Sequence, residues 1–201
     1  MKRTVLFLLA AFLLISVISV LPIHGEGAIY DSVIRLHVLA NSDSEADQAL
    51  KLTVRDALLA KTRVLLAEVK TRDEAEDILE DALGVLTATA SEVVVREGYD
   101  YPVRIVLGEE EYPTRRYENL AFPAGEYLSM RVLIGEGAGE NWWCVLFPPL
   151  CLSAATAKSE AEEAFLAAGL TGEQYRIITD SENGKYRLRF KILEVAKELF
   201  D

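Results

Sequence analysis

The hydrophobic and polar positions of this chain follow three successive patterns. Residues 5–21 are almost uniformly apolar, residues 42–98 carry apolar side chains at helical spacing, and residues 103–147 tend to alternate apolar and polar side chains. Spacings of three and four residues place side chains on one face of a helix, whereas a spacing of two places them on one face of a strand. The pattern therefore predicts helices followed by strands, behind a separate apolar N terminus.

Two helices are predicted from capping signals at their starts. Ser42 with Glu45, and Thr71 with Glu74, have the spacing of a capping box, in which both side chains satisfy free backbone N–H groups of a first helical turn. Gly98 is suited to follow the second helix, because glycine adopts a positive φ without steric cost.

Strands are predicted where the period is two, at residues 34–39, 103–107, 112–117, 127–134 and 142–147. The first is expected to be half-buried, with Ile34, Leu36 and Val38 on one face. Glycine-containing segments at 108–110 and 122–125 suit the turns of an antiparallel meander.

The last third of the chain adds helices and one short strand. Residues 154–168 are rich in Ala and Glu and are expected to form a helix that ends at Gly169. Residues 175–179 are expected to be a short strand, and residues 188–199 a helix. The fold class is therefore α+β, a mostly antiparallel sheet with helices packed on it, although the pattern does not set the strand order.

The apolar N terminus is typical of an export signal. Lys2 and Arg3 precede the run, and Gly25 offers a cleavage site. A run of 17 residues is also at the short limit for a spanning helix, so a signal peptide over residues 1–25 and an uncleaved anchor both fit. Residues 26–201 contain no repeat or linker and are expected to form a single α+β domain.

Charge and composition narrow the class of function. The chain has 21 basic and 32 acidic residues, and its net charge of −11 argues against a general nucleic-acid binder. Removal of residues 1–25 leaves 19 basic and 32 acidic residues, a net charge of −13. Two cysteines and two histidines leave little for a metal centre, and no cofactor is expected. The acidic turn at 41–47 lacks the glycine and closing glutamate of a calcium loop, and helix capping explains it better.

The segment Asn141–Cys151 carries the candidate chemistry. Adjacent Trp142 and Trp143 would face opposite sides of a strand, one toward the core and one toward solvent or a partner. In an exported protein Cys144 and Cys151 can pair as a disulfide or remain structural thiols. The alternative is an exported cell-envelope hydrolase with Cys144 as nucleophile and His37 as base, although no third, orienting residue is evident.

Two long motifs resemble the stage II sporulation protein R family. The first runs from Ile34 to Ser44 and continues through Asp47–Leu52 and Val54–Ala57, and the second is Asn141–Cys151. They stand in the family's order, and together with the leader they extend the resemblance from one end of the chain to the other. Residues 153–169 carry no such motif.

The resemblance implies a secreted intercellular signal of endospore formation and not an enzyme. Family members are made in the forespore and exported into the space between the forespore and mother-cell membranes. There they activate a membrane-embedded aspartic protease of the mother cell, which cleaves the pro-form of the mother-cell sigma factor, sigma-E. We therefore expect this protease as partner, no nucleic acid or small-molecule substrate, and membrane contact only during export.

A partner-binding surface is expected from the polar and aromatic residues of the two motifs, because Arg and aromatic side chains often dominate interface energy. Capping and core packing are the alternative roles of the same residues. The candidates are Arg35, His37, Asn41, Ser42, Asp43, Arg55, Trp142 and Trp143.

Overall fold

A four-stranded mixed sheet forms the centre of the computed structural model, which describes residues 29–117, 120–148 and 158–179. Its strands, in spatial order, are β2 (Val103–Tyr112), β5 (Gly125–Ile134), β1 (Ile34–Leu39) and β6 (Asn141–Phe147). A separate hairpin pairs β3 (Arg115–Tyr117) with β4 (Leu120–Phe122). Two of the three pairings in the sheet are antiparallel, which confirms the mostly antiparallel α+β class.

The expected meander is wrong, because β1 lies between β5 and β6. It runs parallel to β5 and antiparallel to β6, so two strands that follow each other in sequence do not pair. Strand β1 was expected to be half-buried, yet five of its six residues are buried. A central strand is covered on both faces, and its apolar residues Ile34, Leu36 and Val38 are therefore part of the core.

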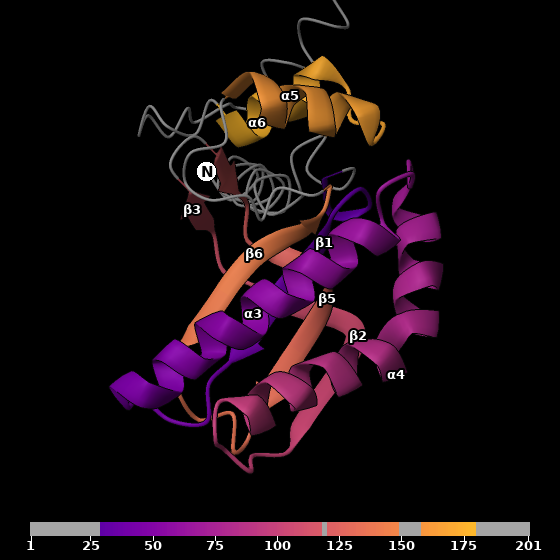
Figure 1. The fold of residues 1–201 in the computed structure, drawn as a ribbon. Coiled ribbons are helices and arrows are strands. Elements are labelled where there is room, and N and C mark those ends of the chain that lie inside the picture. The colour runs from indigo at the N-terminus through magenta and orange to yellow at the C-terminus, as the bar shows by residue number, and fades with distance from the viewer. Residues whose placement is uncertain (1–28, 118–119, 149–157, 180–201) are drawn as a thin grey trace, which may run out of the picture.

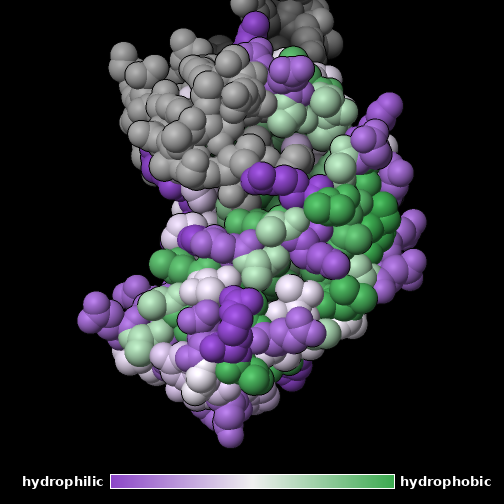
Figure 2. Space-filling view, in the orientation of Figure 1, coloured by the Kyte–Doolittle hydropathy of each residue, from purple (hydrophilic) through white to green (hydrophobic). Residues whose placement is uncertain are grey.

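Helices α3 (Glu45–Leu65) and α4 (Arg72–Arg96) cover one face of the sheet (Figure 1). This helix-covered face contains the larger core, in which Leu50, Val54 and Leu58 of α3 pack with the sheet residues Leu36 and Met130. On the outside, polar residues dominate, and hydrophobic side chains remain visible between the two helices (Figure 2). The amphipathic pattern of the sequence thus becomes a layer of helices on a sheet.

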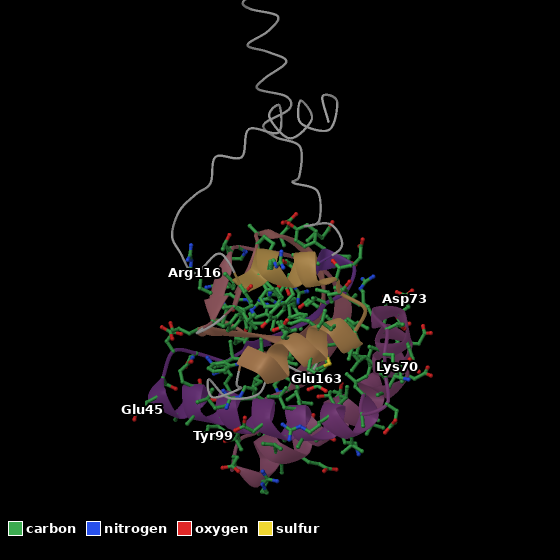
Figure 3. All side chains as sticks on the ribbon, turned by 90° about the horizontal axis from the view of Figure 1, so that it is seen from above. Glu45, Lys70, Asp73, Tyr99, Arg116 and Glu163 are labelled. Carbon is green, nitrogen blue, oxygen red and sulfur yellow. The ribbon has the colours of Figure 1, made fainter. Side chains whose placement is uncertain are left out.

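The opposite face of the sheet carries a second core. Helices α5 (Lys158–Ala167) and α6 (Gly172–Thr179) lie with β3 at one end of the molecule (Figure 1). Their side chains Phe165, Tyr175 and Ile178 pack in one cluster with the sheet residues Tyr112 and Tyr127. Figure 3 shows α3, which begins at Glu45, and the hairpin that carries Arg116 on opposite sides of the molecule.

Several local expectations are confirmed and several are wrong. Thr71 caps α4 by accepting from the N–H of Glu74, and Gly98 follows the helix with φ 86°. The cap of α3, however, is Ser44, which accepts from the N–H of Asp47, so the Ser42–Glu45 capping box is wrong by two residues. The same Ser-x-x-acid spacing recurs at Ser44, and Ser42 makes a different bond, described below.

The strand boundaries differ from the sequence pattern for tertiary reasons. The expected turn at 108–110 lies inside β2, because the ten residues of β2 pair continuously with the ten of β5. Tyr112 ends β2, so the expected strand 112–117 is reduced to β3. The expected strand 175–179 is part of α6, where Tyr175 and Ile178, three residues apart, both face the core.

Several expectations fall outside the described residues: the export signal at 1–25, Cys151, the start of the helix expected at 154–168, and the helix at 188–199. Within the described residues, no helix combines the length and the hydropathy needed to span a bilayer.

Candidate functional site

Asn41 and Ser42, which follow β1, form hydrogen bonds with Asp47 in the first turn of α3. The buried Asp47 carboxylate accepts hydrogen bonds from Ser42 Oγ at 2.5 Å and from Asn41 Nδ2 at 2.9 Å. These bonds, that of Ser42 foremost, keep the pKa of Asp47 below its usual value although burial acts in the opposite direction. The turn therefore stabilises a buried anion at a helix N terminus, where the helix dipole also favours it.

The same turn is tied to the loop between β5 and β6. Asn41 Oδ1 accepts from the N–H of Glu136 at 3.0 Å, and Asp43 Oδ1 accepts from the N–H of Glu140 at 2.6 Å. Lys51 Nζ donates to the Glu140 carbonyl at 2.8 Å, and burial lowers the pKa of this lysine. The polar turn of the first motif therefore holds the fold together, and its contact with a partner stays a prediction.

His37 links the two edge strands of the sheet. Its Nδ1 lies 2.8 Å from Glu110 Oε1 on β2, and its Nε2 lies 2.8 Å from Asn141 Oδ1 on β6. The ring stacks on Trp143 with 5.2 Å between centroids, and Arg131 Nη1 lies 3.8 Å from the same Glu110 oxygen. With both ring nitrogens engaged, the imidazole acts as a fixed connection in the sheet.

Arg35 is fully buried in a cage of aromatic rings. Its guanidinium carbon lies 4.5 Å from the ring centroid of Tyr112, 4.9 Å from Phe122 and 5.2 Å from Tyr127, and Nη2 donates to Tyr117 Oη at 2.9 Å. Among the described residues, Nε and Nη1 have no hydrogen-bond partner. Burial raises the pKa values of Tyr112 and Tyr117, so both phenols stay neutral. Cation–π contacts thus stabilise this charge where an ion pair would be usual.

Each tryptophan of β6 is covered by an arginine, on opposite faces of the sheet. Trp142 faces the side of α3, where Arg55 lies 4.3 Å from its ring centroid, and 38% of Trp142 remains exposed. Trp143 faces the other side, and Arg115 of β3 lies 3.4 Å from its centroid. Trp142 is therefore the tryptophan that faces solvent.

The geometry contradicts a Cys144–His37 catalytic pair. Cys144 is in register with Leu36 and packs against the helix-covered core, whereas His37 is in register with Trp143. Consecutive residues of a strand face opposite sides, so the thiol and the imidazole are on opposite faces of the sheet. Cys144 is also disulfide-bonded, and its expected partner, Cys151, lies outside the described residues.

The sequence reasoning missed the residues that β2, β3 and β5 bring to His37 and Trp143. Glu110 was assigned to a turn, and Arg115 and Arg131 had no recognised role. Only the alternation of charged and apolar residues in β5 gave a signal, because it places Arg131 opposite the helix-covered face. No group of three or more metal-ligating side chains occurs in the ranges that the structure describes.

Comparison with known proteins places these motifs in one family. The family model of stage II sporulation protein R matches residues 30–157. Stage II sporulation protein R of Bacillus subtilis (strain 168) is 38% identical over 160 residues, which cover 75% of this chain and 71% of the relative. No solved structure matches. The match contains β1 and its polar turn, both long helices and β6 with its tryptophans. This chain therefore belongs to the stage II sporulation protein R family.

Proposed function

We propose that this protein is an exported signal of endospore formation that activates a membrane-embedded aspartic protease of the mother cell. It is made in the forespore, enters the space between the two membranes, and triggers cleavage of the pro-form of sigma-E. Membership of the sporulation family is the observation that carries the proposal. The basic and apolar N terminus supports export.

Activation by binding requires a difference in affinity between two states of the protease. A ligand shifts an equilibrium only as far as it binds the favoured state more tightly. A rigid contact surface suits this role, because little ordering entropy is then lost on association. The hydrogen-bonded turn of Asn41, Ser42 and Asp43 supplies such rigidity behind α3 and β6.

The contact surface that we propose is centred on Arg55 and Trp142. These two side chains stack on each other, and Leu52, three residues before Arg55 on α3, is 36% exposed. Exposed tryptophan and arginine are enriched among the residues that contribute most to interface energy. Arg35 and His37 are buried, and in this proposal they support the surface from within the sheet.

Co-expression in a non-sporulating host tests the proposal. The chain, the candidate protease and the pro-sigma factor are expressed together, and processing is measured with and without the chain. We expect processing only with the chain, and loss of most of it in the double variant Arg55→Ala/Trp142→Ala. Processing without the chain would refute the activator role.

A matched control separates contact from folding. The double variant Arg63→Ala/Val64→Ala truncates an arginine and an apolar side chain at the exposed end of α3, where Val64 is 76% exposed. It is expected to process as the wild type does. Equal processing by both double variants, with both proteins folded by circular dichroism, would exclude the Arg55–Trp142 surface and leave the activator role intact.

A further inference from the structure

Part of the second sheet face is exposed, and we call this part the open sheet face. The strand registers place its residues in two rows across the four strands. The outer row is Arg104, Leu133, Leu39 and Asn141. Of the inner row, only Val106 and Arg131 belong to the open sheet face, because His37 is buried and Arg115 of the hairpin covers Trp143.

Exposure shows that the described elements leave this face to solvent. Arg104 and Asn141 are exposed, 38% of Val106 is exposed, and 45% of the Arg131 side chain is exposed. At Gly108, the next position of this face on β2, an added Cβ would meet no atom within 4 Å. The next row inward is closed, since Arg35 and Ser129 are buried.

The open sheet face is positive on a protein that is strongly negative. Among the described residues, Arg104 has no carboxylate within ion-pair distance, and Arg131 approaches only Glu110, at 3.8 Å. Arg104 and Arg131 are diagonal neighbours on adjacent antiparallel strands, a relation that places their Cα atoms about 7 Å apart. The acidic residues Glu109 and Glu111 alternate to the helix-covered face, where Glu109 pairs with Arg72.

Helix α4, on the other face of the sheet, carries a large share of the negative charge. Helix α4 alone carries seven acidic and two basic residues, and the whole chain has a net charge of −11. Such a chain is repelled by an anionic membrane at long range. The two arginines are therefore better suited to a local contact with a specific acidic group than to a lipid surface.

We propose that the open sheet face docks an acidic segment of the partner protein, with carboxylates against Arg104 and Arg131 and an apolar side chain over Val106. Guanidinium groups bind carboxylates in a bidentate geometry, and the half-buried Leu39 and Leu133 provide an apolar floor between the charged positions. This inference rests on the proposed function, since it adds a second contact with the same protease, on the sheet face opposite the Arg55–Trp142 surface.

A charge-reversal pair tests the surface in the same co-expression host. Arg104→Glu/Arg131→Glu is compared with Arg63→Glu/Arg96→Glu, which changes the net charge equally on exposed helix positions. We expect the first variant to capture the protease about tenfold or more weakly than wild type, and the second to bind nearly normally. A photo-crosslinker at Val106 is expected to label the protease, and one at Val95 of α4 is not.

The outcomes separate the two proposals. If the wild type supports processing and both charge-reversal variants capture the protease equally well, the docking role of the open sheet face is refuted. The activator role then still holds. No processing with the wild type overturns the activator role and this inference together. Binding of the wild type to phosphatidylglycerol vesicles that is lost in Arg104→Glu/Arg131→Glu assigns the face to a membrane and overturns the protein partner.

Discussion

The side-chain amide of Asn41 donates to the Asp47 carboxylate across 2.9 Å and joins the end of β1 to the first turn of α3. Ser42 donates to the same carboxylate oxygen, so a buried anion receives two bonds from the preceding turn. A buried charge is stable only when such partners compensate for its lost hydration. This short connection orients α3, the helix of the first motif, on the sheet.

The variant Asp47→Asn is expected to lower the free energy of unfolding at pH 7 by about 1–3 kcal/mol, because it removes a charged acceptor of buried hydrogen bonds. The folded-state pKa of Asp47 is below its usual value of 3.8. Its stabilisation is therefore fully present above the unfolded-state pKa and is lost as the pH falls through the folded-state pKa. Urea unfolding from pH 7 to pH 3 should show the difference between wild type and variant shrinking below about pH 4.

Asp56→Asn is the control for this prediction, since the Asp56 side chain is 64% exposed and forms a surface ion pair with Arg55. It is expected to change stability by less than about 1 kcal/mol. A constant difference between Asp47→Asn and wild type across the pH range would contradict the role of the Asp47 charge.

Gly139→Ala and Gly84→Ala are expected to change stability in opposite directions. A Cβ at Gly139 would collide with the backbone carbonyl of Ser42, which accepts a hydrogen bond from Gln48 Nε2 of α3. A Cβ at Gly84, inside α4, would meet nothing within 4 Å, so alanine there should stabilise by about 0.5–1 kcal/mol. Thermal unfolding of both variants measures this contrast, and a stabilised Gly139→Ala protein would show that the two loops do not approach closely.

Arg35→Met is expected to keep the free energy of unfolding within about 1 kcal/mol of wild type, because it replaces a buried charge that lacks an ion pair with an apolar side chain. Arg35→Ala should lose more than about 2 kcal/mol through the cavity it leaves among the rings. Denaturant unfolding compares the two variants. An equal loss in both would mean that the charge itself, through its cation–π contacts, stabilises the core.

The two tryptophans are expected to differ in exposure and in energetic weight. In the single-tryptophan protein Trp143→Phe, the remaining Trp142 should be quenched readily by acrylamide, whereas Trp143 in Trp142→Phe should be protected by Arg115 and His37. Trp143→Ala should lower stability by about 3 kcal/mol, and Trp142→Ala by much less. Equal quenching in the two proteins would contradict the opposite orientation of these side chains.

Local patterns in the chain were sufficient for the features that depend on neighbours in sequence. Thr71 caps α4 because its hydroxyl reaches the N–H three residues ahead, and Gly98 ends it because only the local φ matters there. The alternation of Ile34, Leu36 and Val38 correctly placed them on one face, toward α3. The same rule correctly placed Trp142 and Trp143 on opposite faces.

The failures come from contacts between distant parts of the chain. Nothing in the sequence of β1 shows that it separates β5 from β6, because strand order follows from burial of the whole sheet. The Ser42 hydroxyl donates to Asp47 and does not cap α3. A hydrogen bond to a buried carboxylate stabilises the fold more than one to an exposed N–H at a helix start.

The sequence by itself determined the two long helices, the faces of the strands, the acidic charge and the two motifs that resemble one family. Only the tertiary structure decided which of those residues are available to a partner. Arg35 and His37, on the central strand, are enclosed by rings and by hydrogen bonds from both edges, whereas Arg55 and Trp142 meet at the surface. The reason is physical: exposure depends on what packs above a side chain, and in this fold those residues come from segments far away in the chain.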